Sequence, residues 1–176
     1  MVKKMKKIIL ILNHVQAGMG SDEHANLAPS GKKAALGPGQ TLQPYLKEHD
    51  AEIIATLFCG DQYYLQHQAE VAKKFVGFAK KFQADAILCG PAMHYPNFGE
   101  MAGSLAEILN QQGIPAIAAM SQENPATDVY KDIVPIVKMP KKGGIGLNES
   151  FKNMALLVVE KAKGQDTEKL ETQICF

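Results

Sequence analysis

Short apolar runs alternate along the chain with segments of helical length. The five runs that predict strands are residues 7–13, 51–60, 84–90, 114–120 and 132–139. Each run is apolar at nearly every position, which is typical of parallel strands that are covered on both faces. Pro135 interrupts the last run, and because proline cannot donate to a sheet ladder, we expect this strand at an edge of the sheet.

Apolar residues between these runs recur at the helical period. They predict amphipathic helices over residues 64–83, 98–112 and 149–163, and a shorter helix over 39–48. Strands that alternate with helices form right-handed crossovers and an open parallel sheet. We therefore predict an α/β fold: a single doubly wound domain, flavodoxin-like or Rossmann-like, with a mainly parallel five-stranded sheet in the order 2-1-3-4-5 and helices on both faces.

This domain is expected to span residues 1–163, and residues 164–176 form a charged tail for which we expect weak order. Residues 14–38 are unusual, because a connection from strand to helix normally takes about 2–6 residues. The segment has little periodicity and several glycines, which permit close backbone approach. We therefore favour a functional loop over a mobile surface insertion.

The composition fits one globular domain with small or neutral partners. The 176 residues are 46% hydrophobic and 21% charged, and the net charge of +1 gives no case for nucleic acid or an anionic membrane. The run "IILIL" is too short for a signal segment, and no run approaches the roughly 20 residues of a membrane helix. Three scattered cysteines do not suggest disulfides, so we expect a cytoplasmic, reduced protein.

Ligands of open α/β sheets bind outside the carboxyl ends of the strands. Four loops are expected there, and they contain "NHVQAGMGSDEHAN", "CGDQYY", "PAMHYPNF" and "SQENPATDVY". If His14, His94 and Asp61 converge, they would bind a metal, serve acid–base chemistry or simply pack, and the residues leave these alternatives open. Glu123 is either a site carboxylate or a cap. "KKGGIG", residues 141–146, is either an anion-binding loop or an ordinary turn.

A series of segments resembles one known family in order and spacing. The segments are "AGMGSDEHAN", "GPGQTL", "AEIIATLFCGDQYY", "ADAILCGPAMHYPNFG", "QQGIPAIAAMSQENPATDVYK" and "IVPIVK". Together they resemble the amino-terminal half of the selenoprotein B subunit of the glycine, sarcosine and betaine reductases. The resemblance covers residues 8 to about 163.

The resemblance implies a subunit of a reductase complex that splits an amine from the α-carbon of glycine or its N-methylated relatives. It implies no cofactor in this chain, because the family's selenocysteine lies in a carboxyl-terminal half and the pyruvoyl group belongs to another subunit. The expected partners are these two reductase chains and a small amino acid or betaine-like substrate. We also expect a homo-oligomer, with Tyr63, Tyr64, Tyr95 and Phe98 near the interface.

Rim position and resemblance together give the candidate site residues. The candidate catalytic residues are Cys59, Asp61, His94 and Glu123. The candidate substrate-binding residues are Asn13, His14, Gly18, Gly20, Glu23, Gly90, Pro91, Tyr95, Asn97 and Asn124. We assign no metal ligand.

Three functional readings remain open. The first is a reductase subunit that depends on a partner chain for its nucleophile and is inactive alone. The second is a non-catalytic module that binds a small amino acid. The third is an independent acid–base or metal enzyme that uses the same cleft.

Overall fold

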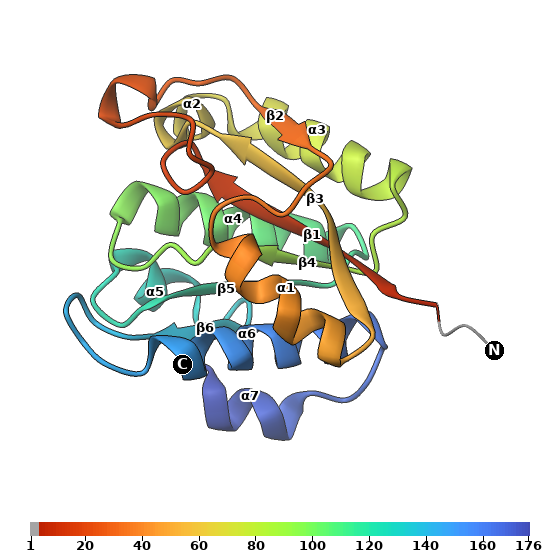
Figure 1. Ribbon diagram of the computed structural model, residues 1–176. Coiled ribbons are helices and arrows are strands. Elements are labelled where there is room, and N and C mark those ends of the chain that lie inside the picture. The colour runs from red at the N-terminus through yellow and green to blue at the C-terminus, as the bar shows by residue number, and fades with distance from the viewer. Residues whose placement is uncertain (1–3) are drawn as a thin grey trace.

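The computed structural model describes residues 4–176, in which six strands form one sheet between two layers of helices (Figure 1). The five parallel strands are β1 (Lys6–Asn13), β3 (Ala51–Cys59), β4 (Ala86–Cys89), β5 (Ala116–Ser121) and β6 (Ile136–Met139). They lie in the order β3-β1-β4-β5-β6, which confirms the predicted doubly wound order. Strand β6 is an edge strand, as Pro135 predicted.

A sixth strand lies in the long first loop. Strand β2 (Ser30–Lys32) pairs antiparallel with β3, and the short helix η1 (Asp22–His24) precedes it. The prediction of five strands was therefore one short. All three residues of β2 are exposed, so no apolar alternation marks the strand in the sequence.

Helices cover both faces of the sheet. Helices α1 (Pro38–Glu48) and α6 (Leu147–Ala162) pack together on one face. Helices α2 (Asp61–Gln66), α3 (Gln68–Lys81), α4 (Pro96–Gln111) and α5 (Pro125–Tyr130) lie on the other. The helix predicted over 64–83 is in fact two helices, because His67 takes a non-helical conformation between them. Within residues 4–176, no helix has the length and apolar character needed to cross a membrane.

The core is centred on β1, in which the five consecutive residues Ile8–Leu12 are fully buried. Burial on both faces explains why the run is apolar at every position rather than at alternate ones. Close packing at the helices depends on glycine at two points. A Cβ on Gly39 of α1 would lie 2.9 Å from Leu10, and a Cβ on Gly103 of α4 would lie 2.4 Å from the Tyr130 ring.

The charged tail is ordered, contrary to expectation. Residues Glu168–Ile174 form α7, and Cys175 makes an antiparallel bridge with Val137 of β6. Lys161 of α6 donates to the Glu171 carboxylate across 3.2 Å, which ties the tail to the domain. Glu171 therefore helps to hold the tail against the domain, whereas Asp166, Glu168 and Lys169 are exposed.

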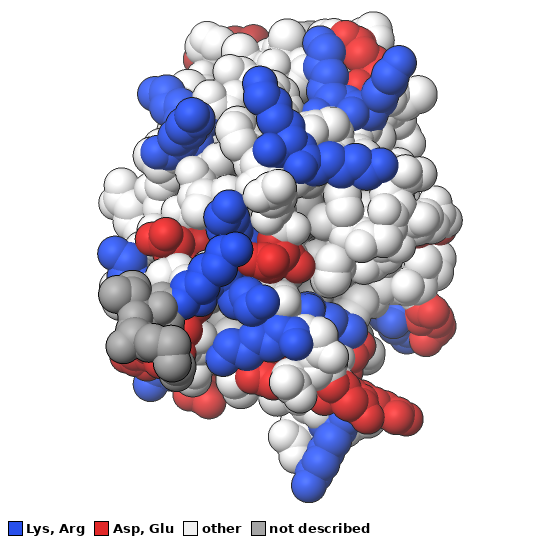
Figure 2. All heavy atoms as spheres, turned by 90° about the vertical axis from the view of Figure 1, so that its right-hand side faces the viewer, with Lys and Arg blue, Asp and Glu red and all other residues white. Residues whose placement is uncertain are grey.

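Figure 2 shows the side of the molecule on which the parallel strands begin. Many basic side chains lie on this face, and acidic side chains are interspersed among them. A mixture of positively and negatively charged side chains is typical of a solvated surface. The strands end on the opposite side, which is where the candidate site is found.

Candidate functional site

A pocket of about 280 Å³ opens among loops that follow the parallel strands. These loops lie on the left of Figure 1. Three segments line the pocket: Gln16 after β1, residues 93–95 after β4, and residues 140–144 with Leu147 after β6. We call it the rim pocket. The loops after β3 and β5 were also predicted to lie at the site. Their residues do not line the pocket, but their side chains form hydrogen bonds that support its walls.

Asn124 holds the wall formed by residues 93–95. Its Nδ2 donates to the carbonyl oxygens of Met93 at 3.1 Å and Tyr95 at 3.0 Å, and its Oδ1 accepts from Ala126 N at 3.0 Å. Both ends of the amide are therefore engaged, so this predicted substrate-binding residue builds the wall instead. Gly99 is required beside it, because a Cβ there would lie 2.3 Å from Asn124 Oδ1.

Glu123 holds the wall formed by residues 140–144. Its Oε1 accepts from the main-chain N–H of Lys142 across 2.7 Å. This contact anchors the loop and leaves the Lys142 ammonium uncommitted. Neither Lys141 nor Lys142 forms an ion pair with any residue in the described range 4–176.

Asn13 and Asp61 form a buried pair below the Gln16 wall. Asn13 Nδ2 donates to Asp61 Oδ2 at 3.1 Å, and Asn13 Oδ1 accepts from Gln16 N at 2.9 Å. Asp61 is the first residue of α2. These two candidate residues therefore connect β1, α2 and the first loop, and they act on the pocket through Gln16.

Packing against the first loop explains the "CGD" turn after β3. Gly60 N donates to Leu27 O at 2.8 Å, and a Cβ on Gly60 would lie 2.2 Å from Ala25 O. The Cys59 thiol donates to the same Leu27 oxygen across 3.5 Å. The turn thus anchors the long loop to the sheet.

The thiol of Cys59 is fully buried. Burial, with a smaller effect of the nearby Asp61 and Glu70 charges, raises its pKa to about 12. Burial also raises the pKa of the Cys89 thiol above its ordinary value. The thiolate is the reactive form, so this environment does not suit Cys59 to the nucleophilic role predicted for it.

His14 is the unsatisfied polar group of this region. Its side chain is 2% exposed, and neither ring nitrogen has a hydrogen-bond partner among the described residues. A buried polar group without a partner costs about 1–3 kcal/mol, so such a group calls for an explanation.

His14 lies in the turn directly after β1, where its carbonyl oxygen accepts from Met19 N at 2.8 Å. Neither of its ring nitrogens is hydrogen-bonded to Asp61, whose Oδ2 accepts from Asn13. No group of three His, Cys, Asp or Glu side chains able to hold a metal occurs among residues 4–176.

His94 and Tyr95 line the rim pocket, and their rings stack with centroids 4.3 Å apart. Asn97 is exposed in the first turn of α4. Gly90 and Pro91 are buried, and a Cβ on Gly90 would lie 2.8 Å from Ala119 O. These two residues therefore shape the backbone beneath the wall.

The outer part of the first loop does not line the rim pocket. Gly18, Gly20 and Glu23 are all exposed, and Glu23 accepts a hydrogen bond from Ser21. That bond is the main cause of the lowered pKa of Glu23. Two of the aromatic residues expected at an interface, Tyr64 and Phe98, are core residues.

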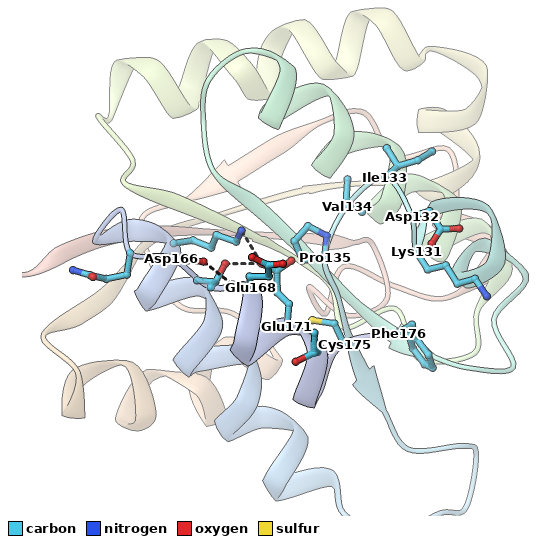
Figure 3. Close-up of a pocket in the computed structure, with 14 residues that line it drawn as sticks. Lys131, Asp132, Ile133, Val134, Pro135, Asp166, Glu168, Glu171, Cys175 and Phe176 are labelled. Atoms are coloured by element: carbon cyan, nitrogen blue, oxygen red, sulfur yellow. Dashed lines mark hydrogen bonds and ion pairs between the residues drawn. The ribbon is translucent and has the colours of Figure 1, made fainter.

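A larger cavity of about 760 Å³ lies between α7 and the chain that leads into β6 (Figure 3). Its Glu171 carboxylate accepts from Lys161 at 3.2 Å and from Thr167 Oγ1 at 2.5 Å, so Lys161 and Glu171 are paired with each other. Burial is the main reason that the pKa of its Cys175 thiol is raised to about 12. The cavity lies where β6 begins, away from the carboxyl edge of the sheet.

Sequence reasoning gave the loop of residues 140–147 too little weight. This loop supplies a whole wall of the rim pocket, yet no residue in it was named as a site candidate. The signal was present, since "KKGGIG" before a helix is one of the patterns that bind anions.

Comparisons with known proteins agree on one family. The family model for glycine/sarcosine/betaine reductase selenoprotein B matches residues 5–174. The sarcosine reductase complex component B subunit beta of Peptoclostridium acidaminophilum is 34% identical over 163 residues, which is 92% of this chain and 37% of the relative. The glycine reductase complex component B subunit gamma of Carboxydothermus hydrogenoformans is 30% identical over 161 residues, 91% of this chain and 37% of the relative.

A more distant relative belongs to a third complex. The betaine reductase complex component B subunit beta of Peptoclostridium acidaminophilum is 27% identical over 128 residues, 72% of this chain and 29% of the relative. The matched part of the chain thus spans between 29% and 37% of the length of these relatives. No solved structure matches it.

Proposed function

The chain belongs to the glycine/sarcosine/betaine reductase selenoprotein B family, and we propose that it is a component-B-like subunit of a complex that reductively cleaves the C–N bond of a small amino acid or betaine. In this proposal the chain binds the substrate, and a partner chain supplies the nucleophile. The observation that carries the proposal is the family match over residues 5–174, which includes every segment that lines the rim pocket.

Displacing an amine from a saturated carbon requires a strong, activated nucleophile. The three cysteines of this chain are buried, and burial raises the pKa of each thiol. The chain's own side chains therefore do not fit that step. The proposal assigns the nucleophile to a selenocysteine on a partner chain and the engagement of the substrate amine to a pyruvoyl group on another subunit. The residues of this chain would bind and orient the substrate.

The proposal places the protein in the cytoplasm, where free thiols remain reduced. It also expects a homo-oligomer or a larger assembly that covers the rim. Four large apolar or amphipathic side chains are exposed on the loops around the rim pocket: Val15, Tyr95, Ile145 and Leu147. Exposed groups gathered in this way favour an interaction surface.

A stand-alone binding module is the second candidate function. The buried, protonated thiols favour it, because such a module needs a pocket and no nucleophile. Both candidates predict substrate binding by the isolated chain without turnover. They differ in whether the chain can act inside a reductase.

A chimera tests the proposal. Residues 5–174 would replace the matching segment of the Peptoclostridium acidaminophilum sarcosine reductase component B subunit beta, and the chimera would be assembled with the other components of that complex. Released amine is measured anaerobically with glycine, sarcosine or betaine and a dithiol reductant. The control is the same chimera with its selenocysteine replaced by serine.

We expect amine release from the chimera and none from the control or from the isolated chain. A chimera that assembles but releases no amine with any substrate would leave only the binding module. Amine release by the isolated chain would overturn the assignment of the nucleophile to a partner.

A further inference from the structure

We propose that the groove between β2 and α3 docks an extended acidic segment of a partner protein, which adds a strand to the sheet at β2 and inserts one aromatic side chain into the groove. This inference goes beyond the proposed function, because the groove and the rim pocket have no lining residue in common. Three features carry it: an open strand edge, an apolar groove beside that edge, and unpaired lysines around the groove.

The open edge belongs to β2, the outermost strand at one end of the sheet (Figure 1). It pairs with β3 on one side, and residues 30–33 form no main-chain hydrogen bond outside this ladder with any part of the described chain. In an antiparallel pair only alternate residues exchange hydrogen bonds, so the other N–H and C=O groups of β2 face outward. A partner segment in extended conformation can pair with such groups.

The groove beside this edge is apolar. It is lined by residues 31–33, by Ala55 and Leu57 of β3, and by Phe78 and Phe82 of α3. Phe78 is 37% exposed, and its ring stacks on that of Phe82 with centroids 5.9 Å apart. The volume of about 150 Å³ is below the roughly 300–1,000 Å³ of small-molecule sites. An apolar cavity of about 150 Å³ holds a benzene-sized group, so the groove fits one aromatic side chain.

Lysines surround the groove. Lys32 and Lys33 line it, and Lys81 follows Phe78 by three positions, which places it on the same side of α3. None of these three lysines forms an ion pair within residues 4–176. Lys33 lies over the Phe82 ring, with its Nζ 5.6 Å from the ring centroid. The groove is therefore an apolar site with a basic border.

Acidic side chains of the chain itself do not neutralise this border. No lining residue is acidic, and Glu70, the one acidic residue of α3, is paired with Lys74 at 3.4 Å. Figure 2 shows basic side chains gathered on the upper part of that face, over the ends of β2 and α3, whereas most of the acidic ones lie lower. The charge that complements this surface is negative.

The charge and the open edge together select the occupant. Lysines on an exposed edge repel a second copy of the same edge, which is one way in which proteins prevent edge-to-edge association. An acidic segment is attracted instead. Membrane lipids and nucleic acids are also acidic, but they do not offer the alternating N–H and C=O groups that pair with a strand. A polypeptide satisfies the lysines, the groove and the edge together.

The first test measures binding of one labelled probe peptide, acetyl-Asp-Glu-Thr-Phe-Thr-Glu-Asp-amide, to the full chain by fluorescence anisotropy. In a strand its phenylalanine and both glutamates lie on one face. We expect the double variant K32E/K81E to bind the peptide at least about tenfold more weakly than the parent does. Replacing the peptide's phenylalanine with alanine should also cost about tenfold in affinity.

The matched control is K47E/K163E, which reverses two exposed lysines at the ends of α1 and α6, on the other face of the sheet. It should bind the peptide as the parent does. No binding of the peptide to the parent, or equal affinities of K32E/K81E and K47E/K163E, would overturn the docking surface.

The second test concerns the strand edge. Amide hydrogen exchange of residues 30–33 should slow when the peptide is added, because an added strand protects outward N–H groups. N-methylation of alternate peptide residues removes the donors from one edge of the peptide at a time. Of the two peptides methylated in this way, one should bind about tenfold more weakly than the other. Unchanged exchange together with equal affinities of the two peptides would overturn the added strand.

A third measurement separates the classes of partner. Phosphatidylglycerol vesicles and single-stranded DNA are offered to the same parent and variants. We expect neither to bind more tightly than the peptide. Tighter binding of either one, lost in K32E/K81E, would overturn a polypeptide as the occupant. The activity of the chimera does not enter these outcomes, because both substituted lysines lie outside the rim pocket.

Discussion

The side-chain amide of Asn13 donates to the Asp61 carboxylate across 3.1 Å, which joins the end of β1 to the first residue of α2. Both side chains are more than nine-tenths buried. The carbonyl oxygen of Asn13 accepts from Gln16 N at 2.9 Å, so the pair fixes one wall of the rim pocket. Asp61 and Asn13, which were predicted from the sequence as a catalytic and a substrate-binding residue, therefore also support the wall of the site.

The first prediction follows from this pair. Asp61→Ala leaves the Asn13 amide buried without its acceptor, and we expect a loss of about 1–3 kcal/mol in the free energy of unfolding. Asp61→Asn retains an oxygen that can accept the same hydrogen bond, so its loss should be smaller. Urea unfolding of both variants provides the measurement. Equal losses would show that the hydrogen bond contributes little.

The second prediction concerns Gly99 and Asn124. A Cβ on Gly99 would lie 2.3 Å from Asn124 Oδ1, and overpacking of this kind costs about 1–3 kcal/mol. Asn124→Ala removes both the clash and the clamp on residues 93–95. We therefore expect the losses of Gly99→Ala and Asn124→Ala to be less than additive in the double variant. Additive losses in thermal or urea unfolding would show that the two sites are independent.

The third prediction is that the thiols are unreactive in the folded chain. Cys59 and Cys89 are fully buried and Cys175 nearly so, and each has a raised pKa. Iodoacetamide should leave all three unmodified in native buffer and modify all three in urea, as mass spectrometry would show. Rapid native alkylation of Cys59 would restore it as a candidate nucleophile.

The fourth prediction is a loss of stability at alkaline pH. The unfolded thiol of Cys59 loses its proton near 9.0, whereas burial raises the pKa in the folded chain to about 12. Between these values the folded state binds more protons, so the contribution of Cys59 is complete below pH 9.0 and declines as pH rises toward 12. Unfolding free energies measured up to about pH 11 should fall less steeply for Cys59→Ala than for the parent. Parallel curves would contradict the raised pKa.

The fold was largely predictable from the sequence because its signals are local. A buried parallel strand such as Ile8–Leu12 is apolar at every position, and Pro135 alone indicated the edge position of β6. Strand β2 was not predicted, because it has no such local signal. Its residues Ser30–Lys32 are exposed, and the strand exists only because β3 offers an edge to pair with.

The site was less predictable because its roles depend on partners far apart in the chain. Asn124 is a polar residue on the correct loop, but its amide is engaged by carbonyl groups about thirty positions earlier. Cys59 follows a strand at the rim, yet the first loop folds back over it. Only the structure distinguishes a polar side chain that faces a ligand from one that builds the wall beside it.

The last prediction tests whether a partner covers the rim. Ile145 is 96% exposed, beside the rim pocket, and an exposed isoleucine in a loop makes no contribution to the core. Ile145→Lys should therefore change the free energy of unfolding by no more than about 0.5 kcal/mol. In the chimera it should lower amine release, because a partner surface that packs on Ile145 would have to desolvate the lysine charge.

Val129→Lys is the matched control, since Val129 is 57% exposed on α5 and does not line the rim pocket. Reduced activity of the Ile145 variant alone, with assembly followed by light scattering, would place the partner over the rim. Equal activity of the two variant chimeras would mean that the rim stays open during turnover. In that case the nucleophile would have to reach the substrate without burying the loop of residues 140–147.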